Sequence, residues 1–203
     1  IGGGFIGSEI AAAMALNDVE VTMFFPENGV GGRIFPSKLS QFLNDVFIQH
    51  GVRVVAGERV SGIERSGSRY HISAEGGQSA DVDCVVAGLG VLPRTDLAEA
   101  AGLKTGDGVV VNENLQSSHP DVYAAGDVAN FYNPLLQQRL RVEHDDNTSA
   151  MGKVAGKNIA GQHAQYDYLP MFYADLFDLG YEAIGETSAN LETVSHWEEF
   201  GRK

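Results

Sequence analysis

Four glycines within the first seven residues constrain this chain more than any other feature. The sequence opens with Ile1-Gly2-Gly3-Gly4-Phe5-Ile6-Gly7-Ser8-Glu9, in which Gly2, Gly4 and Gly7 form a Gly-x-Gly-x-x-Gly pattern. In such a pattern the first glycine permits a tight turn, the second lets a phosphate approach the backbone, and the third lets a helix pack closely on a strand. The alternative is a glycine-rich turn that binds nothing. The segments that follow the motif distinguish between these two interpretations.

These segments alternate between helix and strand. Residues 5–16 carry an apolar, alanine-rich run that predicts a buried helix, and residues 19–25 are rich in β-branched and aromatic side chains, which favours a strand. Residues 37–50 have apolar side chains at helical spacing and lead into a further strand at residues 52–56. The order predicts a βαβ repeat, with Ile1 as all that remains of its first strand.

The middle and end of the chain continue an α/β pattern. Residues 60–82 alternate with a period of two and predict an antiparallel meander. Residues 84–87 form an apolar run typical of a parallel strand covered on both faces, which places Cys84 in the core. We expect further helices at residues 95–101 and 145–161, an extended segment at residues 109–111, and a buried strand at residues 122–125.

Composition excludes several classes of function. With 14 basic and 27 acidic side chains the formal net charge is −13, which disfavours nucleic acid or an anionic membrane as a partner. A single cysteine, Cys84, excludes a disulfide framework, a Cys-x-x-Cys pair and a cysteine-rich metal site within this chain. We expect no membrane span and no signal peptide, because no apolar run approaches about 18 residues and no basic segment precedes one.

Two carboxylates stand where α/β sheets bind sugar-like hydroxyls. Glu27 ends the second predicted strand, near the spacing of about 20 residues at which an acidic side chain accepts hydrogen bonds from the adenosine ribose. A carboxylate there repels a 2′-phosphate and favours NAD over NADP, although Arg33 could pair with such a phosphate. Asp127 follows Gly126 at the end of another predicted strand. A solvated turn residue is the alternative reading of both.

Metal or side-chain catalysis is not expected. Glu143, His144, Asp145 and Asp146 offer hard ligands, but consecutive residues seldom converge on one ion. We expect residues 145–147 to cap the helix that begins there. The sequence contains no Gly-x-Ser-x-Gly elbow, and we therefore propose neither a metal site nor a catalytic side chain.

Three motifs together resemble a known superfamily. IGGGFIGSE, VVAGLGVLPR and DVYAAGDVANF, in this order and spacing, resemble the NAD fingerprint, the domain-crossing turn and the second FAD motif of the pyridine nucleotide-disulfide oxidoreductases. Three longer stretches, FFPENGVGGR, LRVEHDDNTSAMGKVAGKNIAG and MFYADLFDLGYEAIG, resemble the apoptosis-inducing factor branch of that superfamily. The resemblance covers nearly all of the chain.

The resemblance implies a specific α/β architecture. Residues 1–91 would form a Rossmann-like, three-layer NAD-binding domain, and residues 92–169 the second segment of a discontinuous FAD-binding domain. Residues 170–203 would begin an α+β C-terminal interface domain. The first FAD fingerprint would then precede Ile1, and we expect the chain to be a fragment of a longer protein.

The resemblance also implies cofactor-binding residues, FAD and NAD being the cofactors. The NAD pyrophosphate would lie along Gly2, Gly3, Gly4, Phe5, Ile6 and Gly7, its adenosine end at Glu27 and Arg33, and its nicotinamide side at Glu9 and Gly90. The FAD ribitol and pyrophosphate would lie at Gly126 and Asp127, and Glu143 and His144 where flavin and nicotinamide meet. Tyr173, which stands where the branch usually has a tryptophan, and Glu182 complete the set. The amide end of the helix at residue 145 would face the pyrimidine edge of the flavin.

The implied activity is that of an FAD-dependent NADH oxidoreductase that passes electrons to an acceptor the sequence does not identify. Two alternatives are an NADH-responsive, redox-sensing flavoprotein with little turnover and a ferredoxin or rubredoxin reductase. The net charge argues against the last one, because an acidic partner favours a basic docking face. A homodimer is compatible with the resemblance, and the expected location is cytoplasmic, or mitochondrial in a eukaryote.

Overall fold

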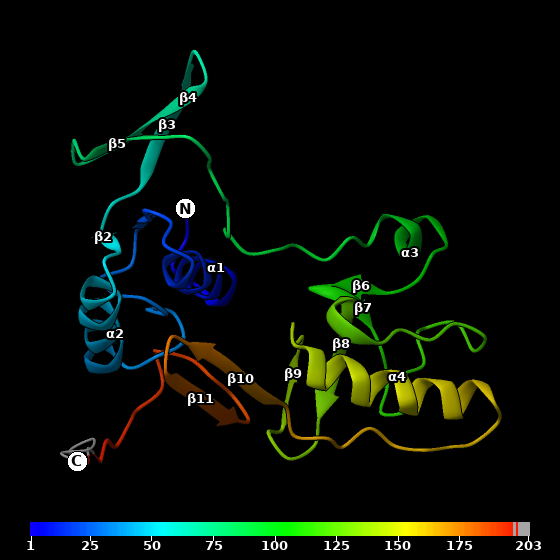
Figure 1. The fold of residues 1–203 in the computed structure, drawn as a ribbon. Coiled ribbons are helices and arrows are strands. Elements are labelled where there is room, and N and C mark those ends of the chain that lie inside the picture. Colours follow the sequence, from blue (N-terminus) through cyan, green and yellow to red (C-terminus); the bar gives the residue numbers. More distant parts are fainter. Residues whose placement is uncertain (197, 199–203) are drawn as a thin grey trace. The chain divides into compact units, whose positions relative to one another are not determined.

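The computed structural model describes residues 1–196 and 198, which form two compact units. The first unit comprises Ile1–Gly90, Leu176–Asp178 and the described residues from Thr187 onward, and the second comprises Val91–Asp175 and Leu179–Glu186. Figure 1 traces the elements of both units along the chain. The division into domains at residues 1–91, 92–169 and 170–203 remains a prediction, and residues 197 and 199–203 of the last domain lie outside the described residues.

A row of parallel backbone segments forms the centre of the first unit. Strands β1 (Thr22–Phe25) and β2 (Arg53–Ala56) pair in parallel. On the other side of β1, the Gly2 N–H donates to the Phe24 carbonyl at 2.8 Å. The Ile1 nitrogen donates to the Val86 carbonyl at 2.7 Å, and the Gly88 N–H donates to the Ile1 carbonyl at 2.8 Å. Across the row the segments therefore lie in the order β2, β1, residues 1–2 and residues 86–88. Numbered along the chain, this is the order 3-2-1-4 of a Rossmann sheet.

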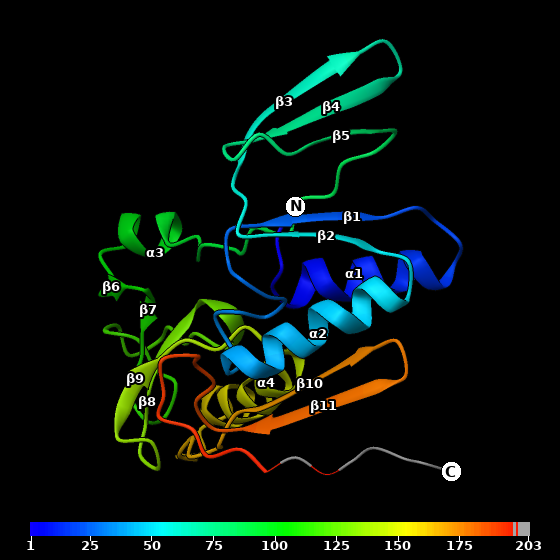
Figure 2. The same cartoon turned by 90° about the vertical axis from the view of Figure 1, so that its left-hand side faces the viewer.

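Two layers cover this row. Helices α1 (Phe5–Leu16) and α2 (Ser37–Gln49) lie along one face of β1 and β2, and the antiparallel sheet of β3 (Val60–Ser66), β4 (Arg69–Ala74) and β5 (Ser79–Val82) lies beyond the other (Figure 2). A core of Phe24, Val55, Ile72 and Ala74 joins the parallel and antiparallel layers. The predicted βαβ repeat and the antiparallel meander are confirmed.

One expectation for the first unit is wrong. Residues 84–87 do not form a regular strand, and Cys84 is exposed rather than buried in the core. The apolar run predicts a central strand, which needs a partner along its length. Its described backbone partner in the row is residue 1, held by the two hydrogen bonds to Val86 and Gly88, so a regular ladder does not form.

The second unit is a four-stranded sheet packed against helix α4 (Asp145–Ile159). The strand order is β6 (Thr105–Gly106), β7 (Gly108–Val110), β8 (Ala129–Asn133) and β9 (Gln138–Leu140), with β7 and β8 parallel and the other neighbours antiparallel. Met151 and Ala155 of α4 pack into a core with Phe131 and Tyr166. The predicted long helix is therefore confirmed, and its apolar face covers the sheet.

Shorter elements complete the second unit. Helix α3 (Asp96–Ala100) precedes the sheet, the 3-10 turn η1 (Gly126–Val128) leads into β8, and β10 (Met171–Leu176) pairs with β11 (Leu179–Ile184). The expected strand at residues 122–125 is wrong, because only Tyr123 forms a bridge there, to Gln116, and Val122 is exposed. Among the described residues, no helix combines the length and apolar character needed to cross a membrane.

Candidate functional site

The first and third glycines of the opening motif are required by close backbone packing. Gly2 has a φ of +109°, and a Cβ there would lie 2.1 Å from the Gly88 carbonyl oxygen. A Cβ on Gly7 would lie 2.2 Å from the Gly2 carbonyl oxygen. Gly3 faces β1, since its Cβ would lie 2.8 Å from the Phe25 ring. These three glycines let helix, turn and sheet approach one another.

Gly4 differs from its neighbours because a Cβ there would meet no atom within 4 Å. It is the N-cap of α1, makes no side-chain cap hydrogen bond, and is followed by a first turn without an acidic residue. A glycine without a packing partner, at the positive end of a helix, leaves a surface on which a pyrophosphate can lie against the backbone. The residues present therefore fit the phosphates of a dinucleotide.

Glu27 and Arg33 form an ion pair in the loop after β1. The Arg33 Nε donates to Glu27 Oε1, and the Glu27 side chain is 21% exposed while that of Arg33 is 77% exposed. The loop is tightly folded, since a Cβ on Gly32 would lie 2.8 Å from the Cβ of Glu27. The two residues predicted for the adenosine end are thus brought together, with the guanidinium in solvent and its charge offset by the carboxylate.

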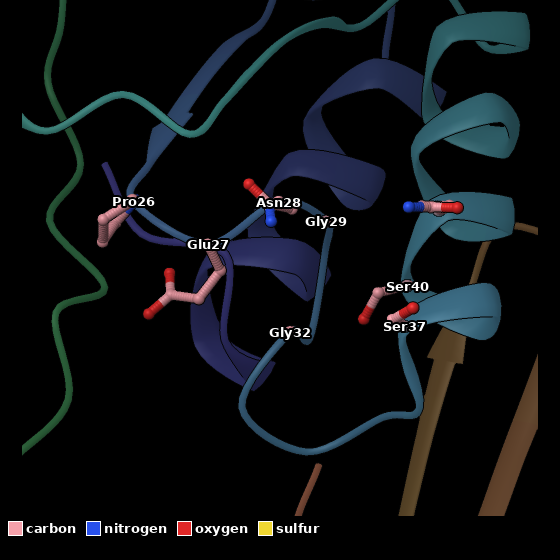
Figure 3. A pocket seen from close by; sticks show the side chains of 8 residues that line it. Pro26, Glu27, Asn28, Gly29, Gly32, Ser37 and Ser40 are labelled. Carbon is pink, nitrogen blue, oxygen red and sulfur yellow. The ribbon is translucent and has the colours of Figure 1, made fainter. Parts of the chain in front are cut away.

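A pocket of about 320 Å³ lies between this loop and the start of α2. Its polar lining is visible in Figure 3, with the loop on one side and the helix on the other. The pocket adds five side chains to Glu27, which was predicted from the sequence. The loop and the helix line it with the side chains of Pro26, Glu27, Asn28, Ser37, Ser40 and Gln41. For the three added residues in α2, the position of residues 37–41 directly after the loop was the only signal in the sequence, because their motif is not distinctive.

A second pocket, of about 570 Å³, lies within the other unit and contains four predicted residues. Asp127 Oδ1 accepts a hydrogen bond from the Thr148 hydroxyl at 3.2 Å. The lining also includes four residues that were not predicted, namely Ala125, Val128, Asp145 and Thr148. The lining includes Gly126, Asp127, Glu143, His144, Asp145 and Thr148.

Arg141 holds one side of this pocket in place. Its guanidinium pairs with Asp107 at 3.0 Å and with Glu143, and donates to the Asp127 carbonyl at 3.0 Å. Burial lowers the pKa of Arg141, but hydrogen bonds and charges from Glu143 and Asp107 raise it above its ordinary value overall. The permanent positive charge fixes the backbone of Asp127 and the carboxylate of Glu143 beside the pocket.

His144, rather than an acidic residue, caps helix α4, which corrects the expected cap at residues 145–147. His144 Nδ1 accepts from the Asp146 N–H at 3.3 Å, and the other ring nitrogen lies 3.4 Å from the Tyr173 carbonyl. Asp146 instead accepts from the Tyr168 hydroxyl at 2.6 Å, and the buried Asn147 accepts from Tyr166 at 2.8 Å. Both acceptors are therefore engaged away from the amide end of the helix.

Four further predicted residues do not line either pocket. The Tyr173 ring meets His144 edge-on, with centroids 4.7 Å apart, but does not line the pocket. Glu182 is exposed on β11, and Glu9 is exposed on α1. Gly90 has a φ of +86°, and a Cβ there would meet no atom within 4 Å. The roles of these four residues stay predictions.

The composition of the second pocket fits the polar parts of a flavin nucleotide. The amide end of α4 opens beside Asp145, and Asp127 supplies a carboxylate that can accept from ribitol or ribose hydroxyls. Gly126 has a φ of +74°, which lets the turn present Asp127 next to the helix. Within the described residues, no group of three His, Cys, Asp or Glu side chains could hold a metal ion.

Comparison with known proteins identifies the family. The family model for pyridine nucleotide-disulphide oxidoreductases matches residues 1–152. Apoptosis-inducing factor 1, mitochondrial, of Dictyostelium discoideum is 36% identical over 98% of this chain and 39% of its own length. Monodehydroascorbate reductase 3 of Arabidopsis thaliana is 36% identical over 92% of this chain and 44% of its own.

A solved structure agrees with these relatives. A ferredoxin reductase from Rhodopseudomonas palustris superposes with a TM-score of 0.87 and 30% identity, covering 95% of this chain and 48% of that one. The chain therefore spans less than half the length of the relatives that it matches. The family uses FAD together with NAD(P)H. The resemblance found in the sequence and its α/β fold class are confirmed, and the chain belongs to the pyridine nucleotide-disulphide oxidoreductase family.

Proposed function

We propose that the protein is an FAD-dependent NADH oxidoreductase. The observation that carries this proposal is a contrast among the glycines of the opening motif. A Cβ on Gly4 would meet open space, whereas a Cβ on Gly2 or Gly7 would meet backbone atoms. The chain also belongs to a family of pyridine nucleotide oxidoreductases. When both nucleotides are bound, FAD supplies the redox chemistry by accepting hydride from NADH. This chain contributes binding, orientation and electrostatics.

In the NADH-binding part, the turn of residues 2–7 holds the pyrophosphate at the amide end of α1, and Glu27 accepts hydrogen bonds from the adenosine ribose. A 2′-phosphate would meet the Glu27 carboxylate, whose partner Arg33 already offsets part of its charge. The preference for NADH over NADPH therefore depends on Glu27 keeping Arg33 engaged. Glu9 and Gly90 are assigned to the nicotinamide side.

In the FAD-binding part, Asp127 holds the ribitol and pyrophosphate region while Thr148 fixes its carboxylate. Glu143 and His144 are assigned to the edge where nicotinamide and flavin meet. The Tyr173 ring contacts His144, and Glu182 lies on β11, the strand that follows the one carrying Tyr173. The amide end of α4 stabilises negative charge on the pyrimidine edge of a flavin. We propose no nucleophilic role for a side chain of this chain.

Anaerobic titration with NADH tests the proposal. The FAD-loaded protein should lose its yellow absorbance as NADH is added, with a stoichiometry near one NADH per flavin. Titration with NADPH provides the matched control and should require more nucleotide. A protein that retains its full flavin absorbance under excess NADH would refute the proposal.

A second function is favoured by one relative. Apoptosis-inducing factor 1 is 36% identical over nearly the whole chain, and its name denotes a role other than that of a reductase. We therefore keep as a second candidate an NADH-responsive flavoprotein that senses redox state with little turnover. Slow turnover with artificial acceptors, together with a long-lived reduced complex, would favour the sensor. Rapid turnover would favour the reductase.

The acceptor, the assembly and the location are proposals of the same kind. A ferredoxin-type acceptor is suggested by the Rhodopseudomonas reductase, and the net charge of −13 argues for a docking face outside this acidic chain. Sedimentation with and without NADH tests the homodimer. Cell fractionation tests the cytoplasmic location, or the mitochondrial one in a eukaryote, where the Dictyostelium relative is placed by its name.

A further inference from the structure

Ser40 carries a hydroxyl that the protein itself does not satisfy. The residue lies in α2, is only 3% exposed, and lines the pocket beside Glu27. Among the described residues, its Oγ is the buried side-chain polar atom without a hydrogen-bond partner. Figure 3 shows this hydroxyl on the side of the helix that faces the loop. An unpaired buried hydroxyl is costly, so its position calls for an explanation.

The usual internal partner of a helical serine is already occupied. A serine in a helix commonly donates to the carbonyl four residues earlier, which is that of Pro36. The Pro36 carbonyl accepts from the Ser40 N–H at 3.0 Å and from the Leu39 N–H at 2.9 Å. Two donors already use its lone pairs, so the Ser40 hydroxyl is left to bond on the pocket side.

The loop is built to approach Ser40 closely. A Cβ on Gly29 would lie 2.7 Å from the Cβ of Ser40, and only a glycine permits this contact. The Val30 N–H donates to the Asn44 side chain at 2.9 Å, and this side chain donates to the Asn28 carbonyl at 3.0 Å. The loop is therefore fixed to α2, and the hydroxyl faces a preformed space.

The chemistry of this space suits a sugar rather than a base. Pro26 is the one side chain in the described lining that has no polar atom. The others are a carboxylate, two amides and two hydroxyls, and these donors and acceptors match the hydroxyls of a ribose. A purine ring would instead favour flat apolar walls. The volume of about 320 Å³ suits one part of a nucleotide.

We propose that Ser40 is a positioning residue for the adenosine ribose, acting together with Glu27. A ribose hydroxyl that donates to the Glu27 carboxylate keeps its own lone pairs, and the Ser40 hydroxyl donates to one of them. The inference rests on the proposed function, because it assigns a further contact to the same nucleotide. With this contact, Ser40 contributes to the difference in affinity between ligands that carry a ribose and ligands that carry a deoxyribose.

The test measures binding of AMP, 2′-deoxy-AMP and 3′-deoxy-AMP to FAD-loaded wild type and Ser40→Ala. We expect Ser40→Ala to bind AMP about 3- to 10-fold more weakly, as for loss of one hydrogen bond. The affinity for one of the two deoxy analogues should change much less, because its contact with Ser40 is already missing. The KM for NADH should rise while kcat is retained, since the contact is remote from hydride transfer.

Two controls separate hydrogen bonding from packing. Ser40→Cys fills the same space with a weak donor, and its AMP affinity should fall as in Ser40→Ala. Ser61→Ala removes an exposed hydroxyl that donates to the Ser73 carbonyl, and it should leave AMP affinity unchanged. Thermal unfolding should show Ser40→Ala at least as stable as wild type, because it removes an unpaired polar group.

The outcomes distinguish this inference from the proposed function. A wild-type protein that binds no NADH overturns both. A wild-type protein that binds NADH, with Ser40→Ala keeping the wild-type ratio of AMP to both deoxy affinities, overturns the Ser40 assignment alone. A loss of affinity in Ser40→Ala that Ser40→Cys restores fully would assign Ser40 a packing role and would also overturn the assignment.

Discussion

Replacing Gly4 and Gly7 separately by alanine should affect two different properties of the protein. A Cβ on Gly7 would lie 2.2 Å from the Gly2 carbonyl oxygen, so helix α1 has to move away from the turn. Overpacking of this kind costs about 1–3 kcal/mol or more. For a protein of this size that corresponds to a lowering of Tm by about 2–12 °C. Gly7→Ala should thus be destabilised even without nucleotide.

Gly4→Ala should leave the fold intact. Its φ of −79° and ψ of −171° suit alanine, and a Cβ would meet no atom within 4 Å. The lower entropy of the unfolded chain stabilises by about 0.4–1 kcal/mol, and the poorer N-cap costs a similar amount, so we expect Tm within about 4 °C of wild type. The methyl group would occupy the surface assigned to the pyrophosphate. NADH affinity should fall at least about tenfold, or about 1.4 kcal/mol.

Thermal unfolding of the FAD-loaded variants without NADH, followed by calorimetric titration with NADH, measures the two effects separately. The reasoning predicts that Gly7→Ala loses stability and that Gly4→Ala loses mainly affinity. If Gly4→Ala unfolds as early as Gly7→Ala, its Cβ position is not open. If it binds NADH as tightly as wild type, the pyrophosphate does not lie there.

Three further changes test other parts of the site. Glu27→Ser should free Arg33 for a 2′-phosphate and lower the ratio of NADH to NADPH efficiency, and an unaltered ratio counts against the ribose assignment. Asp127→Ala should weaken FAD retention by about 1–3 kcal/mol, as for loss of a charged hydrogen bond, and unchanged flavin content after dialysis contradicts it. Burial raises the pKa of Tyr166, so the folded protein keeps a proton that the unfolded chain releases near pH 10. Stability should therefore decline as pH rises above about 10, and Tyr166→Phe should flatten that decline in urea titrations, at the loss of the hydrogen bond to Asn147.

Local sequence patterns predicted those helices and strands that bury one face and expose the other, because their apolar side chains recur with a regular period. The helices at α1, α2 and α4 and the meander of β3–β5 follow from periodicity and turn residues. Residues 84–87 and 122–125 show the limit, because an apolar run becomes a strand only when neighbouring backbone pairs with it along its length. Cys84 is exposed for this reason, although its neighbours in sequence are apolar.

The candidate site was only partly predictable. Glycine spacing predicted the turn before α1, and the positions of Glu27 after a strand and of Asp127 after a glycine pointed to two residues that line the pockets. The role of His144 as the cap of α4 was missed because the neighbouring Asp145 and Asp146 are better cap residues by type. Ser40 had no signal in the sequence, since its importance depends on which face of α2 meets the loop and on the two donors already at Pro36.

The contact between the start of the chain and residues 86–88 also has a consequence for biogenesis. The hydrogen bond from Ile1 to Val86 closes a separation of 85 residues, and Gly2 packs on Gly88. Such a non-local closure forms slowly, because the intervening chain must lose entropy before the contact is made. During translation the glycine turn is synthesised before residues 86–88, and Gly2 can pack on Gly88 only after Gly88 has left the ribosome. The glycine turn therefore completes its packing only after the helices and strands between it and Gly88 have been made.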